Sequence, residues 1–242
     1  MNIGTYYSII VYNNGKNLEM SLEKKPLSDE IFHVIRELIE TGEMPSGSKI
    51  SEPILAKKLS VSRGPIRDAI AKLKNCGLVA SQLNVGARVV SLTNEQLIEI
   101  YHIRERLEGL AARFAAEFID NESLDFLRSL LSDQENQLNE KQEYYQKGGD
   151  LDFHYLIVKA SCNEHLIRLF NDSLYYLIRV YRFQYGMKGR RVHSAHKEHS
   201  AIVEAIANQD GEMAELLMRQ HIRLSRMNVE KQINWKGRDE SR

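Results

Sequence analysis

Residues 60–70 read SVSRGPIRDAI, and this stretch decides the fold of the N-terminal part of the chain. Ser62 can cap a helix that is expected to run from about Arg63 to Asn75. Arg63 and Arg67 are four residues apart, so both side chains project from one face of the first turns of that helix. A helix that reads the major groove uses its N-terminal residues, and arginine suits the two acceptors of guanine. The stretch therefore predicts a DNA-recognition helix.

The pattern on either side of this helix is typical of a winged helix-turn-helix. Two amphipathic helices are expected before it, the first capped by Ser28 and the second by Ser51. Gly77 ends the recognition helix, and beyond it the period of the apolar residues changes to that of strands. Two strands joined by a tight turn then form a hairpin, the wing of the motif. The strands are expected at 78–83 and 88–92, and the turn at 84–86.

The charge of this part of the chain agrees with binding to DNA. The 242 residues have no net charge, with 33 basic and 33 acidic side chains. Residues 50–92 carry a net charge of +5, as expected for a DNA-binding module joined to a different domain. An arginine pair four residues apart is more often a solvated helix face, but its place in this basic motif favours contact with DNA. Gly86 would let the backbone of the wing approach the DNA. The side chains expected there are Ser62, Arg63, Arg67, Lys57 and Lys58.

From Thr93 onwards the pattern is helical throughout. Thr93 and Gln96 fit a capping box that opens a long helix. Six antiparallel helices of the expected lengths make a bundle. The predicted fold is thus mainly α: an N-terminal winged helix-turn-helix of three helices and a β-hairpin, then a C-terminal all-α six-helix bundle. The bundle helices are expected at about 93–118, 122–145, 149–160, 164–186, 191–208 and 211–232. The predicted divisions are a tail at 1–24, the winged helix-turn-helix at 25–92 and the helical domain at 93–242.

Four residues of the helical domain predict a metal site. Asp150 and His154 are four residues apart and share one face of a helix, and His199 and His221 lie in the middle of two later helices. One carboxylate and three imidazoles suit a first-row divalent metal such as Zn, Ni or Mn.

The histidine pattern leaves alternatives open. A single histidine in the middle of a helix is more often a core or surface residue than a ligand. The chain has eight histidines, so some spacings arise by coincidence. His193 and His196 lie close to His199 in the sequence, and either could take its place.

The two halves of the chain resemble known domains. Residues 35–92 resemble the DNA-binding domain of GntR-type repressors. The matching residues are Gly42, Gly47, Leu55-Ala56, Val61-Ser62-Arg63, Pro65-Ile66-Arg67, Leu73, Gly77-Leu78-Val79 and Gly86. Residues 95–225 resemble the FCD ligand-binding domain of the FadR subgroup. There the matching residues are Ile103-Arg104, Leu107-Glu108, Ala111-Ala112-Arg113, Asp150, Phe153-His154, Asn163, Glu198-His199, Ile202, Ala205-Ile206, Asp210 and His221.

The resemblance assigns roles to some of these residues. It implies that Asp150, His154, His199 and His221 hold the metal. It also implies that a basic residue near Arg104 helps to hold an organic-acid effector beside the metal. From the residues alone, Arg104 could equally pair with Glu108 on a solvated helix face. The chain departs from the family at Pro53, near which some members have an arginine that contacts DNA, and that contact is not carried over.

The predicted function is that of a sequence-specific transcriptional regulator, a repressor, with no catalytic residues. A small carboxylate bound at the metal is expected to control its affinity for double-stranded operator DNA. A homodimer is expected because helix-turn-helix proteins place two recognition helices on the half-sites of a palindrome.

A cytoplasmic protein is expected, because no apolar run approaches the roughly 18 residues that cross a bilayer and no export signal is recognisable. The two cysteines are expected to be buried thiols.

Two other functions remain possible from the sequence. The metal could be purely structural, although such sites usually contain cysteine, and none lies near these ligands. The chain could also be a metal-dependent hydrolase, but the pattern offers no convincing general base and no nucleophile motif.

Overall fold

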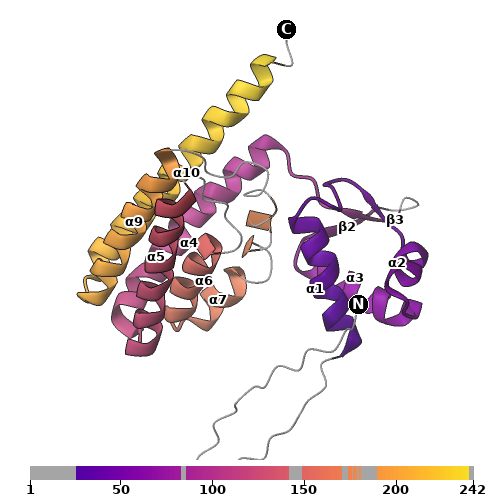
Figure 1. The fold of residues 1–242 in the computed structure, drawn as a ribbon, viewed down its shortest axis with the longest axis horizontal. Coiled ribbons are helices and arrows are strands. Elements are labelled where there is room, and N and C mark those ends of the chain that lie inside the picture. The colour runs from indigo at the N-terminus through magenta and orange to yellow at the C-terminus, as the bar shows by residue number, and fades with distance from the viewer. Residues whose placement is uncertain are drawn as a thin grey trace, which may run out of the picture.

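A computed structural model describes residues 26–82, 86–141, 149–170, 174–175, 177–178, 180 and 190–239. The predicted N-terminal tail at 1–24 and most of the predicted wing turn lie outside the described residues. Figure 1 shows the N-terminal helices and strands gathered beside the longer helices that follow them. In the described part of the chain, no helix contains an apolar stretch of the length that spans a bilayer.

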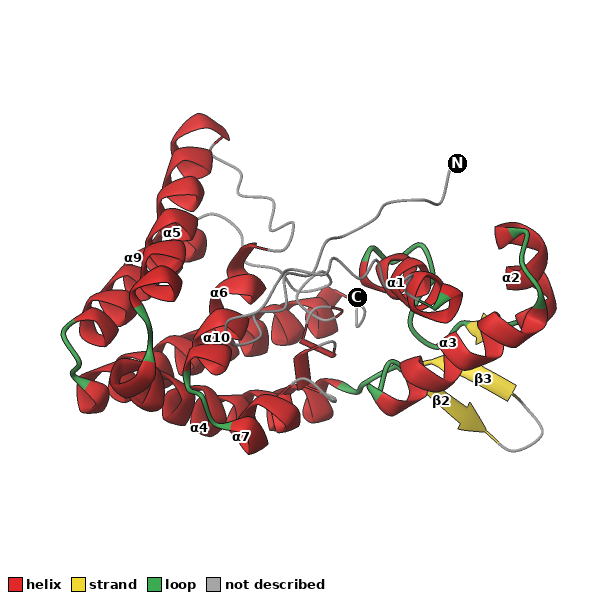
Figure 2. Cartoon of the chain, turned by 90° about the horizontal axis from the view of Figure 1, so that it is seen from below, coloured by secondary structure: helices red, strands yellow, loops and turns green. Residues whose placement is uncertain are grey.

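The N-terminal part contains three helices and a small sheet. Aliphatic side chains from its helices and strands form the core, and Ile35, Ile66 and Leu73 among them are completely buried. Figure 2 shows the hairpin lying beside the recognition helix α3. The elements are α1 (Leu27–Glu40), β1 (Lys49–Ile50), α2 (Glu52–Leu59), α3 (Arg63–Asn75), β2 (Val79–Gln82) and β3 (Gly86–Val89).

The sheet has a strand that the sequence pattern did not predict. The strand order is β1-β3-β2, and both contacts are antiparallel, with Lys49 opposite Arg88 in the first and Val79 opposite Val89 in the second. A strand of two residues is too short to show a period, so β1 becomes visible only when it pairs with β3.

The start of α1 also differs from the expectation. The residue before the helix is Pro26, not Ser28, and Ser28 is buried inside the first turn. The side chain of Lys72 on α3 donates a hydrogen bond to Ser28 Oγ over 3.2 Å and pairs with Asp29. The polar side chains at the start of α1 therefore bind Lys72 of α3 instead of capping the N-terminus of α1.

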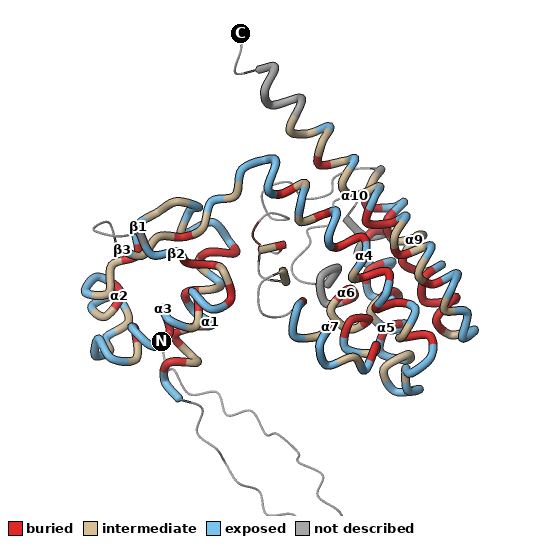
Figure 3. Tube along the Cα trace, turned by 180° about the vertical axis from the view of Figure 1, so that it is seen from behind, coloured by how far each residue is buried: buried red, intermediate tan, exposed pale blue. Residues whose placement is uncertain are grey.

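The helical part of the chain is built around α4. Figure 3 shows buried residues concentrated where α4 meets α9 and α10. Along α4, Ala111, Ala112 and Ala115 are completely buried, and these small side chains allow neighbouring helices to approach closely. The described helices are α4 (Asn94–Phe118), α5 (Asn121–Lys141), α6 (Gly149–Ala160), α7 (Glu164–Leu169), α9 (Arg190–Ala207) and α10 (Gly211–Asp239).

The ends of these helices agree with some of the predictions and differ from others. The capping box of α4 is confirmed: the Gln96 backbone N–H donates to Thr93 Oγ1 over 3.2 Å, and the Thr93 N–H donates to Gln96 Oε1 over 2.9 Å. The last helix continues to Asp239, beyond the expected end at 232. Of the helix predicted at 164–186, α7 covers the start, and the individual residues described from 170 to 180 are helical too.

One cysteine prediction is wrong. Cys76 is buried as expected, whereas Cys162 is exposed in the turn between α6 and α7. Its φ of +50° belongs to the left-handed region, and the apolar pattern of α6 has already ended at Ala160. The thiol consequently lies in a tight surface turn instead of a helix core.

Candidate metal centre and DNA-binding surface

Three histidines from three helices lie together inside the helical part. His154 is on α6, His199 on α9 and His221 on α10, and one ring nitrogen of each lies within 4.8 Å of the others. Each of the three side chains is 1% exposed. Residues so far apart in the sequence can meet only through tertiary packing, so the arrangement of α6, α9 and α10 creates this cluster.

The spacing of the histidine nitrogens fits a metal. Nε2 of His199 and Nε2 of His221 are 3.2 Å apart. Two imidazoles bound to a tetrahedral zinc at about 2.0–2.1 Å would have their nitrogens about 3.3 Å apart. A group of buried imidazoles is also the donor set that zinc and nickel favour. The described residues therefore fit the predicted divalent metal.

The alternatives to His199 point elsewhere. His196 Nε2 lies 3.0 Å from the backbone oxygen of Leu131 on α5, and His193 is exposed. The His199 ring stacks on Phe153 of α6 and lies beside His221 of α10. It is therefore His199 that joins the cluster.

The fourth predicted ligand is Asp150. It lies in the first turn of α6, one helical turn before His154. Its side chain is outside the described part of the structure, so its role as a ligand stays a prediction.

A buried acid that the sequence pattern does not predict to be part of the site, Glu108, lies beside His154. Glu108 Oε2 on α4 lies 2.6 Å from His154 Nδ1, and Arg104 Nε donates to Glu108 Oε1 over 2.6 Å. Arg104 and Glu108 are 2% and 1% exposed. The pairing of these two residues, which the sequence left open as an alternative to effector binding, is thus present, but the pair is buried rather than on a solvated face, because the helices around α4 cover this face.

The charges of this group support one another. Burial would raise the pKa of Glu108, but the Arg104 and His154 charges outweigh it and lower the pKa to about 2. For the cationic Arg104, burial acts in the opposite direction and would lower its pKa. The nearby Glu108 carboxylate outweighs burial, so the pKa of Arg104 is raised. Glu108 is therefore ionised at neutral pH. An ionised carboxylate only accepts, so Glu108 suits a His154 ring that carries its proton on Nδ1 and directs Nε2 to a metal.

A second acid takes the corresponding place behind His221. Glu198 Oε2 on α9 forms a hydrogen bond of 2.7 Å with His221 Nδ1. Arg191 donates from Nη1 to Glu198 Oε1 over 2.7 Å and from Nη2 to Glu198 Oε2 over 2.9 Å. Its Nη2 also donates to Ser225 Oγ on α10 over 3.0 Å. The spacing of residues along the chain predicts neither the Glu108–His154 contact nor the Glu198–His221 contact, because each joins two different helices.

The predicted DNA-contacting side chains lie at the surface of α2 and α3. Arg63 and Arg67 are exposed at the start of α3, and Lys57 and Lys58 are exposed at the end of α2. Arg67 Nε lies 3.8 Å from a carboxylate oxygen of Glu52 on α2. Exposed basic side chains at the start of a recognition helix are available to base edges and phosphates.

Ser62 and Gly86 have the backbone geometry that the predictions require. Ser62 precedes α3 with the extended backbone of a cap residue, but its side chain makes no capping hydrogen bond, so the predicted side-chain cap is not formed and the residue is exposed. Gly86 has a φ of +92°, which other residues rarely adopt, and the space beside it is open.

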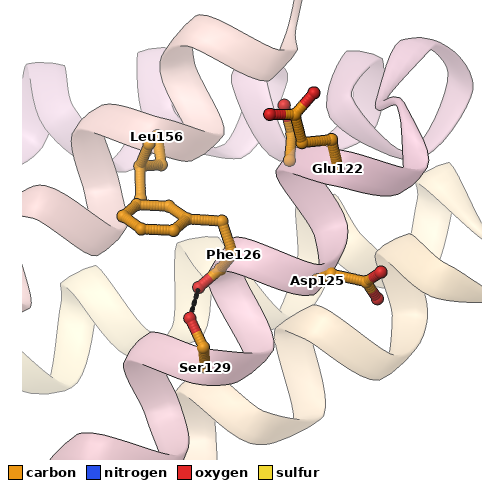
Figure 4. A pocket seen from close by; sticks show the side chains of 6 residues that line it. Glu122, Asp125, Phe126, Ser129 and Leu156 are labelled. Atoms are coloured by element: carbon orange, nitrogen blue, oxygen red, sulfur yellow. Dashed lines mark hydrogen bonds between the residues drawn. The ribbon is translucent and has the colours of Figure 1, made fainter.

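A separate hollow lies between α5 and α6 and has a volume of about 460 Å³. Figure 4 shows the Phe126 ring beside Leu156, with Glu122 and Asp125 on the same helix as Phe126. None of the histidines lines it, and its two carboxylates would repel an acidic effector. The lining residues are Glu122, Ser123, Asp125, Phe126, Ser129 and Leu156.

Comparisons with known proteins match both halves of the chain. Residues 27–89 match the family described as bacterial regulatory proteins, gntR family, and residues 99–224 match the FCD domain. The HTH-type transcriptional regulator YdhC of Bacillus subtilis is 30% identical over 201 residues, which are 80% of this chain and 84% of that protein. The HTH-type transcriptional repressor GlaR of Escherichia coli is 27% identical over 194 residues, which are 75% of this chain and 86% of that protein.

A solved structure has the same fold. The Escherichia coli protein McbR/YncC superposes with a TM-score of 0.71 at 18% identity, over 87% of this chain and all of that one (100%). The family matches, rather than this likeness of fold, determine the class of protein. The chain belongs to the GntR family of bacterial regulatory proteins, in the FadR-like subgroup that carries an FCD domain, and is a DNA-binding transcriptional regulator, not an enzyme.

Proposed function

We propose that this regulator binds operator DNA as a homodimeric repressor, and that a small carboxylate bound at a metal centre changes its affinity for DNA. The observation that carries the proposal is the buried cluster of His154, His199 and His221, backed by two carboxylates. The proposed domains are the winged helix-turn-helix at 25–92 and the metal- and effector-binding domain at 93–242.

The metal would be held by the three histidines together with Asp150. Zinc, nickel and manganese all accept imidazole and carboxylate ligands. A six-coordinate metal held by four protein ligands keeps two positions for another molecule. When bound, the metal would supply a Lewis acid that takes one oxygen of a carboxylate.

Arg104 is the proposed partner of the effector's second oxygen. Its Nε is used by Glu108, and a guanidinium has four further N–H donors. Arginine binds carboxylates through two parallel hydrogen bonds, so it suits an organic acid. Because Glu108 already neutralises Arg104, the affinity for an acid would come from these hydrogen bonds and from the metal rather than from an uncompensated charge.

On the DNA side, Arg63 and Arg67 are the proposed readers of bases. Ser62, Lys57 and Lys58 would hold phosphates, which position the protein without specifying a sequence. The link between the two functions is short, since β3 ends at Val89 and the cap of α4 is Thr93. A tilt of α4 would consequently move the recognition helix of each protomer.

A regulator with a closed structural metal is the second candidate. The observation that favours it is the 1% exposure of each histidine, which leaves little open surface around the cluster. In that case the metal would stabilise the helical part without binding an effector.

Two measurements test the proposal and separate the candidates. Native mass spectrometry with elemental analysis of the purified protein should find one divalent metal per chain. Calorimetric titration of small mono- and dicarboxylates should then find an acid that binds the metal-loaded protein and no longer binds once the metal is removed. A metal without any acid in this panel would favour the structural candidate, and a protein that binds no metal would reject both.

A further inference from the structure

Two arginine–glutamate pairs stand behind the histidine cluster, and they have the same chemical order. Arg104 holds Glu108, which faces His154 Nδ1, while Arg191 holds Glu198, which binds His221 Nδ1. In both cases the acid and the histidine come from different helices. We call these the α4 relay (Arg104, Glu108, His154) and the α9 relay (Arg191, Glu198, His221).

The arginines leave the two acids little freedom. One oxygen of Glu108 is occupied by Arg104, so the other is directed to His154, and both residues are almost completely buried. Arg191 binds both oxygens of Glu198 in the paired geometry that fixes a carboxylate most firmly. Arg191 is itself tied to α10 through Ser225. Each acid is therefore held in place by contacts that do not involve the histidine.

A fixed carboxylate at Nδ1 determines what the other ring nitrogen can do. It selects the form in which Nδ1 carries the proton and Nε2 offers a lone pair to a metal. It also fixes the rotation of the ring. The third ring, that of His199, is oriented in another way, by stacking on Phe153 with ring centres 4.1 Å apart and planes 22° apart.

We propose that Glu108 and Glu198 are positioning residues for the metal, locked by Arg104 and Arg191, and that Glu108 connects the metal to α4. The inference rests on the metal site of the proposed function. The inference also says which helix would respond to the metal. His154, His199 and His221 lie on α6, α9 and α10, so none of these ligands is on α4. Glu108 lies on α4, the helix that follows the wing, whereas Glu198 lies on α9. Glu108 is therefore the acid that would connect the metal to α4.

The experiment compares Glu108→Gln and Glu198→Gln in the full chain, with Glu215→Gln as a matched control. Glu215 is an α10 acid that pairs with Arg113 and Arg219 and takes no part in either relay. Zinc affinity is measured by competition with a chromophoric chelator. Each relay variant should bind zinc about 10–100-fold more weakly, and the control should bind it as the wild type does. The visible absorption of bound Co²⁺ should also change in the relay variants alone.

Hydrogen exchange tests the connection to α4. At saturating zinc, the wild type and Glu198→Gln should gain protection in the middle of α4, and Glu108→Gln should not. If Glu108→Gln keeps this zinc-dependent protection, the connection through Glu108 is rejected.

The measurements distinguish a failure of the positioning role from a failure of the proposed metal site. A wild type that binds no zinc or other divalent metal removes the metal site altogether. A wild type that binds zinc while both relay variants bind it equally well leaves the metal site standing and overturns the positioning role. Should Glu108→Gln fail to fold because Arg104 loses its counter-charge, the zinc affinity of Glu198→Gln decides the positioning role.

Discussion

At the scale of single residues, the two exposed arginines of α3 should govern which DNA sequence is bound. We expect Arg63→Ala and Arg67→Ala each to lose about 1–3 kcal/mol of discrimination, because each bidentate contact to guanine is lost. Lys57→Ala should instead weaken binding to all sequences and flatten its dependence on salt. Binding is measured on an operator selected from random duplexes by the wild type. Unchanged sequence preference in Arg63→Ala would contradict the assignment of the recognition helix.

His154 offers a second test at this scale. Its replacement by alanine should abolish tight metal binding, since the cluster loses one of its three described nitrogens. The metal-dependent rise in thermal stability should disappear as well, because a metal stabilises only the state that binds it. His193→Ala is the control, because His193 is exposed on the same helix as His199 and should leave metal binding intact. A full equivalent of tightly bound metal in His154→Ala would show that this histidine is not a ligand.

At the scale of elements, the close packing of α4 on α10 gives the clearest prediction. A Cβ added at Gly109 would lie 2.5 Å from Arg219 Cγ, whereas one added at Gly64 on α3 would meet nothing within 4 Å. We expect Gly109→Ala to lower the free energy of unfolding by about 1–3 kcal/mol, because Arg219 and its contacts to Glu105 and Glu215 must shift.

Gly64→Ala is the matched control for this helix contact. It should leave the free energy of unfolding unchanged or raise it by up to about 1 kcal/mol, since alanine is the better helix former. Urea denaturation of both variants measures the difference. Equal free energies of unfolding for the two variants would mean that Arg219 and α10 can shift away from the added methyl group without loss of stability.

At the scale of the whole molecule, we expect a homodimer whose two recognition helices contact half-sites related by two-fold symmetry. Their centres should be about 34–36 Å apart or a multiple of that distance. Sedimentation of the free protein and of its complex with selected DNA would report the assembly, and the selected sequences should be palindromic. A monomer both alone and on DNA, with selected sequences that lack symmetry, would exclude this arrangement.

The predicted coupling also belongs to the whole molecule. An effector can change DNA affinity only by its difference in affinity for the two forms of the dimer, typically about 1–3 kcal/mol. Operator DNA must then change effector affinity by the same factor. Calorimetric titration of the bound acid with and without selected DNA measures both. Effector binding that ignores DNA would leave the DNA-binding assignment intact and remove the regulation.

Much of this protein follows from local sequence. The recognition helix after Ser62 and the capping box at Thr93 need only neighbouring residues, so their spacing was enough to predict them. The same holds for the hairpin, which was predicted from two short runs of residues on either side of a turn. These features depend on the period of one element and on its ends, which the chain carries within a few residues.

What the sequence could not determine are the contacts between elements. The spacing placed His193, His196 and His199 on one helix, but only the rotation of α9 against its neighbours decided which of them reaches the cluster. The burial of the Arg104–Glu108 pair was likewise decided by the helices that cover α4. Side chains that meet across helices are joined by packing and not by any period of the chain. The sequence by itself therefore determined the family, the elements and the candidate ligands, and the tertiary structure decided which histidines meet and which acids stand behind them.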